Sequence, residues 1–289
     1  MRHFLIVFLS LFTSVIAATE SLTSSQLFAS RVSALEEKYG GRIGVAVILT
    51  DGAPLLSYKA NERFALCSTF KVLLGAALLS RVDSNRESLD RSISYDSTDM
   101  LEWAPMTKNH LAVGHMTVSE LNAAAIQHSD NTAANLLLNI IGGPQGLTQY
   151  LRSIGDTTTR LDRNEPSLNT NLIGDTRDTS TPNAMATTLQ KILIGNALSP
   201  ASREQLKIWM FGNTTGDSKL RAGFDKTWVI GDKTGSGENG ASNDLAIVFP
   251  RGMPPFIISV FYSESKSSNE TKSAVIAEVA RITSDLLIQ

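Results

Sequence analysis

The pattern of apolar and polar residues predicts strands near both ends of the chain. Residues 24–39 carry apolar side chains at helical spacing, which predicts a first helix that stops at two glycines. An Asp51-Gly52 turn signal then separates two short alternating runs. The sequence therefore predicts strands over residues 44–49, 55–59, 228–232, 245–249 and 256–262, and a closing amphipathic helix over residues 273–287.

Helical patterns dominate the middle of the chain. Residues 69–79 are apolar on nearly every side, which is typical of a helix buried all round. Thr117 and Glu120 have the spacing of a capping box. The polar stretch 160–177 follows neither period, and long ordered loops of this kind are usually functional. We therefore expect helices over residues 69–79, 121–127 and 132–141, followed by a long loop.

This order of elements predicts an α/β (α+β) fold. An antiparallel sheet built from both chain ends and flanked by helices would form one lobe, from residues 19–60 and 212–289. Residues 61–211 would form an all-helical lobe. A cleft between the two lobes is the expected place of an active site.

The N-terminus has the features of a secretory signal peptide. Arg2 and His3 precede an apolar run over residues 4–16, and the small residues Ala17 and Ala18 follow. A membrane anchor or a buried helix is the alternative, but the run is short for a bilayer core of about 30 Å. We expect residues 1–18 to be removed, with cleavage near residues 17–19, which leaves residues 19–289 as a catalytic domain in the periplasm without membrane attachment.

Composition excludes several classes of function. The formal net charge is −2 and basic residues form no stripe, so a nucleic acid partner is not expected. Four histidines lack the spacing of zinc ligands, and we expect neither a metal nor another cofactor. Cys67 is the one cysteine, so no internal disulfide can form. Nothing in the sequence requires more than a monomer.

Ser68 and Lys71 form the first candidate catalytic pair. Ser68 is expected where the buried helix begins, and Lys71 lies on the same face one turn later. A helix N-terminus favours an alkoxide or oxyanion, and a buried lysine readily becomes a base. The pair therefore fits a serine nucleophile with a lysine partner. A helix cap with a lysine reaching to solvent is the alternative.

Two further motifs carry polar groups toward the predicted cleft. Ser129-Asp130-Asn131 falls between two predicted helices, and Lys233-Thr234-Gly235 is expected at the end of a strand, followed by Ser236. Lysine and hydroxyl groups can bind a substrate carboxylate, and a glycine allows close approach of the substrate to the backbone. Each tripeptide alone could be an ordinary turn.

Together the three motifs resemble those of the penicillin-recognising serine enzymes. The loop Arg163-Asn164-Glu165-Pro166-Ser167-Leu168-Asn169 resembles the omega loop of class A β-lactamases, and the resemblance covers essentially the whole mature chain. It implies a Ser68 acyl-enzyme formed from penicillin- or cephalosporin-type antibiotics and cleared by water that Glu165 activates and Asn169 orients. The proton of Ser68 could pass to Lys71 or to Glu165, and the sequence leaves this open.

The resemblance also implies the roles of the remaining residues. It assigns the oxyanion hole to the backbone N–H groups of Ser68 and Ser236, and proton relay to Ser129. It further implies that Arg163 and Asp178 close the neck of the loop. Substrate contacts would come from Trp103, Asn131, Lys233, Thr234, Gly235 and Ser236. The rival interpretations are a DD-peptidase, a penicillin-sensing module and a serine esterase; the first is disfavoured by the Glu165 loop and the last by the missing Gly-x-Ser-x-Gly motif.

One departure from the family concerns the carboxylate site, where class A enzymes usually place an arginine. The corresponding positions hold Lys219, Ser242 and either Ser273 or Ala274. Lys219 could supply the charge but not the bidentate geometry of arginine. Arg221 is expected to have a structural role, pairing with Asp232. Cys67, which in some relatives is disulfide-bonded, is expected to be a small buried apolar residue because Gly237 stands near its usual partner position.

Overall fold

The computed structural model describes residues 22–288. The predicted signal peptide, residues 1–18, lies outside them. Within the described range, no helix combines the length and the apolar character needed to cross a membrane.

A five-stranded antiparallel sheet joins the two ends of the chain, in the order β2-β1-β9-β8-β7. Strand β1 pairs with β9 from Arg42 opposite Ser263 to Leu49 opposite Phe256. The expected sheet of both chain ends is therefore confirmed. Its strands are β1 (Arg42–Leu49), β2 (Pro54–Tyr58), β7 (Val229–Ser236), β8 (Ser242–Phe249) and β9 (Phe256–Ser263).

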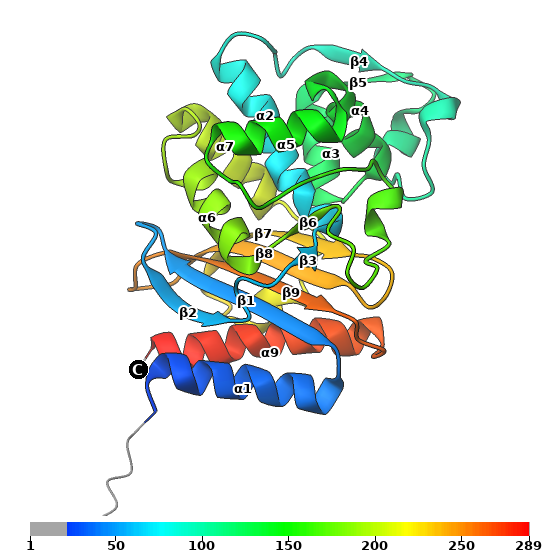
Figure 1. Ribbon diagram of the computed structural model, residues 1–289. Helices are drawn as coiled ribbons and strands as arrows, with labels where there is room; N and C mark the ends of the chain where they lie inside the picture. The colour runs from blue at the N-terminus through cyan, green and yellow to red at the C-terminus, as the bar shows by residue number, and fades with distance from the viewer. Residues whose placement is uncertain (1–21, 289) are drawn as a thin grey trace, which may run out of the picture.

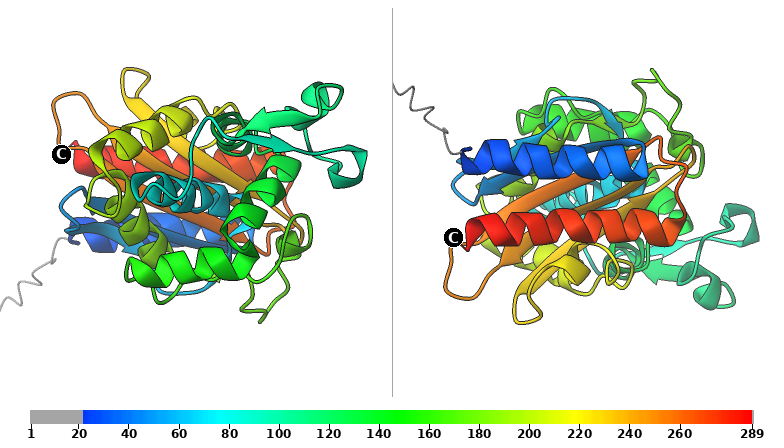
Figure 2. Two further views of the ribbon diagram at one scale, coloured as in Figure 1. Left: turned by 90° about the horizontal axis from the view of Figure 1, so that it is seen from above. Right: turned by 90° about the horizontal axis from the view of Figure 1, so that it is seen from below.

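Two long helices, α1 (Ser24–Tyr39) and α9 (Asn269–Leu287), lie side by side on one face of this sheet (Figures 1 and 2). Phe28 and Val32 of α1 are fully buried against apolar side chains of the sheet and of α9. Thr23 caps α1 through a capping box with Gln26. Burial of each such apolar side chain contributes roughly 1.5–3 kcal/mol, so this layer is held mainly by the hydrophobic effect.

The other face of the sheet carries the remaining large helices (Figure 1). At their centre, α2 is buried over every residue from Phe70 to Leu79, as its apolar sequence predicts. The six helices are α2 (Phe70–Asp83), α3 (Val118–Gln127), α4 (Asn131–Ile141), α5 (Gly143–Ser153), α6 (Pro182–Leu193) and α7 (Pro200–Phe211). The shorter elements are α8 (Leu220–Gly223) and the strand pairs β3 (Phe64–Ala65) with β6 (Thr179–Ser180) and β4 (Ser92–Ser94) with β5 (His115–Thr117).

One expected element boundary is wrong, and three helices were not predicted. Strand β7 continues through Ser236, beyond the expected end at residue 232, so Lys233-Thr234-Gly235 lies near the strand's end but is still paired with β8. Pairing with β8 pins these residues and therefore fixes their side chains more firmly than a turn would. Helices α5, α6 and α7 were not predicted from the sequence. Both α6 and α7 nevertheless carry a start signal, a threonine or serine N-cap residue followed by proline. The division into lobes at residues 60 and 212 stays a prediction.

Candidate active site

Ser68 lies in a single 3₁₀ turn, Cys67–Thr69, directly before α2. Cys67 has a φ of 46°, in the left-handed region, and the Thr69 hydroxyl donates to the Leu66 carbonyl at 2.6 Å. Strained backbone of this kind persists only where surrounding contacts enforce it. Cys67 is fully buried, as expected for a small apolar residue, and burial raises the pKa of its thiol to about 12. The turn therefore presents Ser68, which is 8% exposed, at a defined place beside α2.

Lys71 is the central amine of the site. Its Nζ donates to Ser68 Oγ at 2.9 Å, to the Ser129 carbonyl at 2.9 Å and to Asn131 Oδ1 at 2.6 Å. It also lies 3.0 Å from Glu165 Oε1, and both side chains are fully buried. Burial lowers the pKa of Lys71, while the Glu165 carboxylate acts in the opposite direction. The amine is thus held where it can gain or lose a proton next to Ser68.

The Glu165 carboxylate contacts the nucleophile Ser68 through one oxygen and Asn169 through the other. Its Oε1 accepts from Ser68 Oγ at 3.4 Å, and its Oε2 accepts from Asn169 Nδ2 at 2.6 Å. Asn135 Nδ2 donates to the Glu165 carbonyl at 2.9 Å, and Asn135 Oδ1 accepts from the Glu165 N–H at 3.0 Å. Both hydrogen-bonding groups of the Glu165 backbone are therefore fixed by one side chain of α4.

The break between α3 and α4 places Ser129 and Asn131 in the same cleft. Asp130 caps α4 by accepting from the Ala133 N–H at 2.8 Å and also binds the Thr107 N–H at 2.9 Å. These bonds hold Ser129 at a φ of 58°. The Asp130 carboxylate therefore organises the turn, and the residues on either side of it are free to face the cleft.

Lys233 approaches Ser129 from the opposite wall. Its Nζ donates to Ser129 Oγ at 3.3 Å and to the Thr234 carbonyl at 2.9 Å. Burial, followed by the charge of Lys71, lowers the pKa of Lys233 to about 7. The Thr234 hydroxyl lies 2.5 Å from that of Thr215. This wall thus combines a cation that titrates near neutral pH with two linked hydroxyl groups.

Ser68, Ser129 and Asn131 line one cleft of about 680 Å³, within the usual size of a small-molecule site, and Lys71, Glu165 and Lys233 are buried behind its wall. Trp103 stands at its side, 57% exposed, with Nε1 donating to the His128 carbonyl at 3.2 Å. Direct contacts join Ser68, Lys71, Ser129, Asn131, Glu165, Asn169 and Lys233. Thr234, Gly235, Ser236 and Trp103 line the same cleft.

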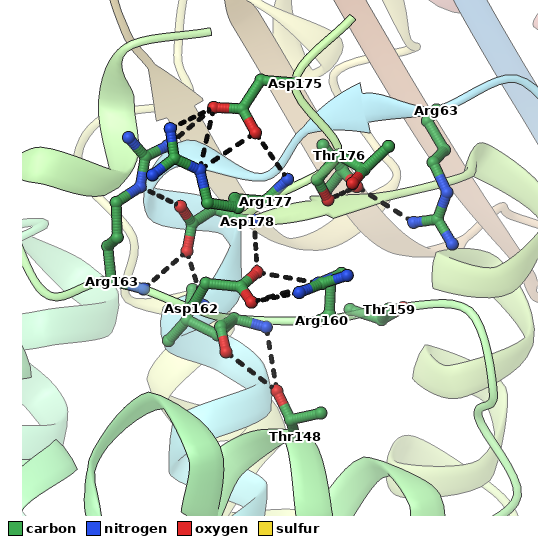
Figure 3. Close-up of polar contacts among 12 residues, drawn as sticks. Arg63, Thr148, Thr159, Arg160, Asp162, Arg163, Asp175, Thr176, Arg177 and Asp178 are labelled. Atoms are coloured by element: carbon green, nitrogen blue, oxygen red, sulfur yellow. Dashed lines mark hydrogen bonds and ion pairs between the residues drawn. The ribbon is translucent and has the colours of Figure 1, made fainter.

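The loop that carries Glu165 is closed by ion pairs at its neck (Figure 3). Arg163 Nε lies 2.6 Å from Asp178 Oδ2, and Asp178 is fully buried. Asp178 Oδ1 accepts from the N–H groups of Asp162 and Arg163 at 2.7 and 2.9 Å, and Asp162 Oδ2 accepts from the Asp178 N–H at 3.0 Å. The pairing of Arg163 with Asp178 is therefore present, embedded in a reciprocal network.

The positions considered for a carboxylate-site cation hold one buried lysine and no arginine. Lys219 is buried, and its Nζ donates to the carbonyls of Gly235 at 3.3 Å and Asn243 at 3.1 Å. Burial lowers its pKa, against the effect of the Asp244 carboxylate. Ser242 is buried in β8, whereas Ser273 of α9 lines the cleft. Arg221 lies 2.5 Å from Asp232, as expected for a structural pair.

Sequence reasoning missed two contributors. Asn135 holds the backbone of Glu165, and Thr215 bonds the hydroxyl of Thr234. Asn135 could have been found, because it follows Asn131 by four residues and therefore lies on the same face of α4. Thr215 lies between helices and carries no local signal. Over the described residues, no cluster of side chains is suited to hold a metal ion.

Comparison with known proteins identifies the family. The model of the β-lactamase enzyme family matches residues 27–287. β-Lactamase OXY-2 of Klebsiella oxytoca is 43% identical over 91% of this chain and 93% of its own length. The carbapenem-hydrolysing β-lactamase KPC of Klebsiella oxytoca is 44% identical over 96% of this chain and 94% of its own length. A solved class A β-lactamase representing the last common ancestor of Gram-negative bacteria is 51% identical, with a TM-score of 0.88 over 90% of this chain and 99% of that one. The chain belongs to the class A serine β-lactamase family.

Proposed function

We propose that this protein hydrolyses the β-lactam ring of penicillin- and cephalosporin-type antibiotics through a Ser68 ester, and so gives antibiotic resistance. The observation that carries the proposal is that Ser68 Oγ contacts both Lys71 Nζ and Glu165 Oε1, at 2.9 and 3.4 Å. A nucleophile in contact with two buried bases is the arrangement that acyl transfer requires.

In the acylation half, Ser68 Oγ forms a bond to the lactam carbonyl carbon, and the lactam C–N bond then breaks. Lys71 or Glu165 accepts the Ser68 proton, since both contact Oγ. Ser129 passes a proton to the departing nitrogen, because its hydroxyl lies within reach of Lys71 and Lys233 at 3.5 and 3.3 Å. The backbone N–H groups of Ser68 and Ser236 bind the oxyanion, and loss of one such donor typically costs about 10²–10³ in rate.

In the deacylation half, Glu165 takes a proton from water as the water attacks the ester carbonyl, and Ser68 leaves with a proton returned to Oγ. Asn169 supports this role because its Nδ2 already binds Glu165 Oε2. Asn169 Oδ1 is buried and accepts no hydrogen bond from any described protein group, so it keeps the capacity to bind the water. Arg163 and Asp178 keep the loop that carries both residues closed.

Substrate binding follows from the two walls of the cleft. Lys233, with the hydroxyls of Thr234 and Ser236, binds the carboxylate of the antibiotic by charge-assisted hydrogen bonds. Gly235 admits the substrate close to β7, and Asn131 binds its side-chain amide. The exposed ring of Trp103 packs against the substrate. β-Lactam-type inhibitors would enter by the same contacts.

We further propose that the protein is exported to the periplasm after removal of residues 1–18 and acts as a monomer without nucleic acid. The N-terminal sequence and mass of the secreted protein test the cleavage, and sedimentation of the purified protein tests the monomer.

A time course of chromogenic cephalosporin hydrolysis tests the proposed activity. Sustained turnover in the usual enzymatic range, roughly 1–10³ s⁻¹, is expected. A single burst equal to the enzyme concentration would replace the proposal with acylation alone, the behaviour of a penicillin-binding or sensing protein.

A further inference from the structure

Three segments that are distant in sequence meet behind Asn169. They are residues 169–171 of the loop that carries Glu165, the turn at residues 238–240 between β7 and β8, and residues 263–265 at the end of β9. Their contacts centre on three side chains, Asn171, Asn239 and Ser263, which we call the asparagine clamp.

Asn171 forms the middle of the clamp. Its Nδ2 donates to the carbonyls of Glu238 and Asn239 at 3.3 and 3.1 Å and to Ser263 Oγ at 2.8 Å. Its Oδ1 accepts from Ser263 Oγ at 3.0 Å, and Ser263 is almost fully buried. The φ of Asn171 is 44°, a conformation that asparagine tolerates better than most residues. One amide thus binds both the turn and the end of β9.

Asn239 binds the loop from the other side. Its Nδ2 donates to the Thr170 carbonyl at 2.7 Å, and the adjacent Glu238 N–H donates to the Asn169 carbonyl at 2.8 Å. The turn itself is fixed, because the Asn239 carbonyl accepts from the Glu264 N–H at 2.9 Å. Three consecutive loop residues, 169 to 171, are therefore each bonded to the turn.

The loop at Asn169 is packed tightly against the edge of β7. A Cβ atom placed on Gly237 would lie 2.7 Å from the Asn169 carbonyl oxygen, so the loop already touches the edge of β7. The neck pair of Arg163 and Asp178 closes the base of the loop, and Asn135 fixes Glu165. Neither of these contacts ties the stretch that follows Asn169 to the sheet, whereas the clamp does.

We propose that the asparagine clamp is a positioning device for the deacylation step. It holds Asn169 at the distance from Glu165 at which the amide and the carboxylate share one water, and Asn171 is its principal positioning residue. This inference rests on the proposed function, since it assumes that Glu165 and Asn169 act in clearing the acyl-enzyme. With Lys71 as the acceptor of the Ser68 proton, the proton transfers of acylation use Ser68, Lys71 and Ser129, none of which the clamp contacts.

Rapid-mixing kinetics with a slowly cleared cephalosporin test the proposal, because acylation and deacylation rate constants are obtained separately. Asn171→Gly removes the amide and keeps access to positive φ, while Asn171→Ala removes the amide and adds backbone strain. Both variants should deacylate about tenfold more slowly than the parent, with acylation changed less than twofold. Asn239→Ala should act in the same direction, and its effect should not add fully to that of Asn171→Gly because the two residues share one network.

Asn85→Ala is the matched control, because Asn85 is exposed and has a φ of 55° in a turn after α2. It should leave both rate constants unchanged. Normal deacylation in Asn171→Gly, or an equal loss of acylation and deacylation in Asn171→Gly and Asn239→Ala, would overturn the inference. A parent enzyme that shows a burst without turnover would instead contradict the proposed function, so the two failures are distinguishable.

Discussion

Replacing Asp178 with alanine should destabilise the protein much more than replacing another aspartate of the same loop. The Asp178 carboxylate is fully buried and accepts from the N–H groups of Asp162 and Arg163 and from Arg163 Nε. Its loss leaves two backbone donors and a mostly buried guanidinium without their acceptor (Figure 3). Breaking a buried ion pair from one side costs about 3–5 kcal/mol.

The low end of that range applies, because Arg163 is 19% exposed and can recover some hydration. A loss of about 3 kcal/mol corresponds to a fall in Tm of roughly 6–12 °C in a protein of this size. Asp178→Asn keeps the shape and one acceptor oxygen but not the charge, so its loss should be intermediate.

Asp175→Ala provides the control. Asp175 pairs with Arg177 at 2.8 Å and lies 3.8 Å from Arg163, but Arg177 is 50% exposed and the contact with Arg163 is long, and pairs of this kind contribute about 0–1 kcal/mol. Urea and thermal unfolding of the three variants, followed by tryptophan fluorescence, give the comparison. Equal losses for Asp178→Ala and Asp175→Ala would refute the argument that burial sets the strength of the neck.

Two further predictions concern the walls of the cleft. Because burial and Lys71 lower the pKa of Lys233 to about 7, the free enzyme loses the positive charge of Lys233 as the pH rises through 7. For carboxylate-bearing substrates, kcat/KM should therefore decline above that pH. The Lys233→Arg variant, whose guanidinium stays charged, should lack this decline. Identical pH profiles of the parent and the variant would show that Lys233 does not cause the decline. Gly237→Ala places a Cβ atom 2.7 Å from both the Asn169 carbonyl oxygen and Cys67 Sγ, so the loop must shift. The kcat of this variant for penicillins should fall about tenfold, with deacylation as the slow step. An unchanged kcat would show that the loop can shift without slowing deacylation.

The local elements of the site could be predicted because each carries its own signal. The apolar run over residues 70–79 predicts α2, and the pairing of Thr117 with Glu120 marks the start of α3. The sheet of both chain ends follows from alternating strands at each end. These features depend on spacing within one segment, which the sequence displays directly.

Contacts between distant segments could not be predicted in the same way. Asn135 and Asn171 look like ordinary helix and loop residues, and they gain a role only because folding brings Glu165 and the β7–β8 turn against them. The burial of Lys219 beneath two carbonyl groups likewise depends on how α8 sits beside β7 and β8. Contacts between side chains that are distant in the sequence produce no periodic pattern in it, so they could not be predicted from that pattern.

The central claim is that Glu165 clears the Ser68 ester, and the Glu165→Ala variant tests it most directly. Removing the carboxylate also removes the charge that raises the pKa of Lys71, so Lys71 should lose its proton more readily and acylation should continue. The measurement is the intact mass of the variant over time after mixing with a penicillin. A stable adduct of one penicillin per protein, located on the peptide containing Ser68, is the predicted result. Rapid return to the unmodified mass, with product released, would contradict the account.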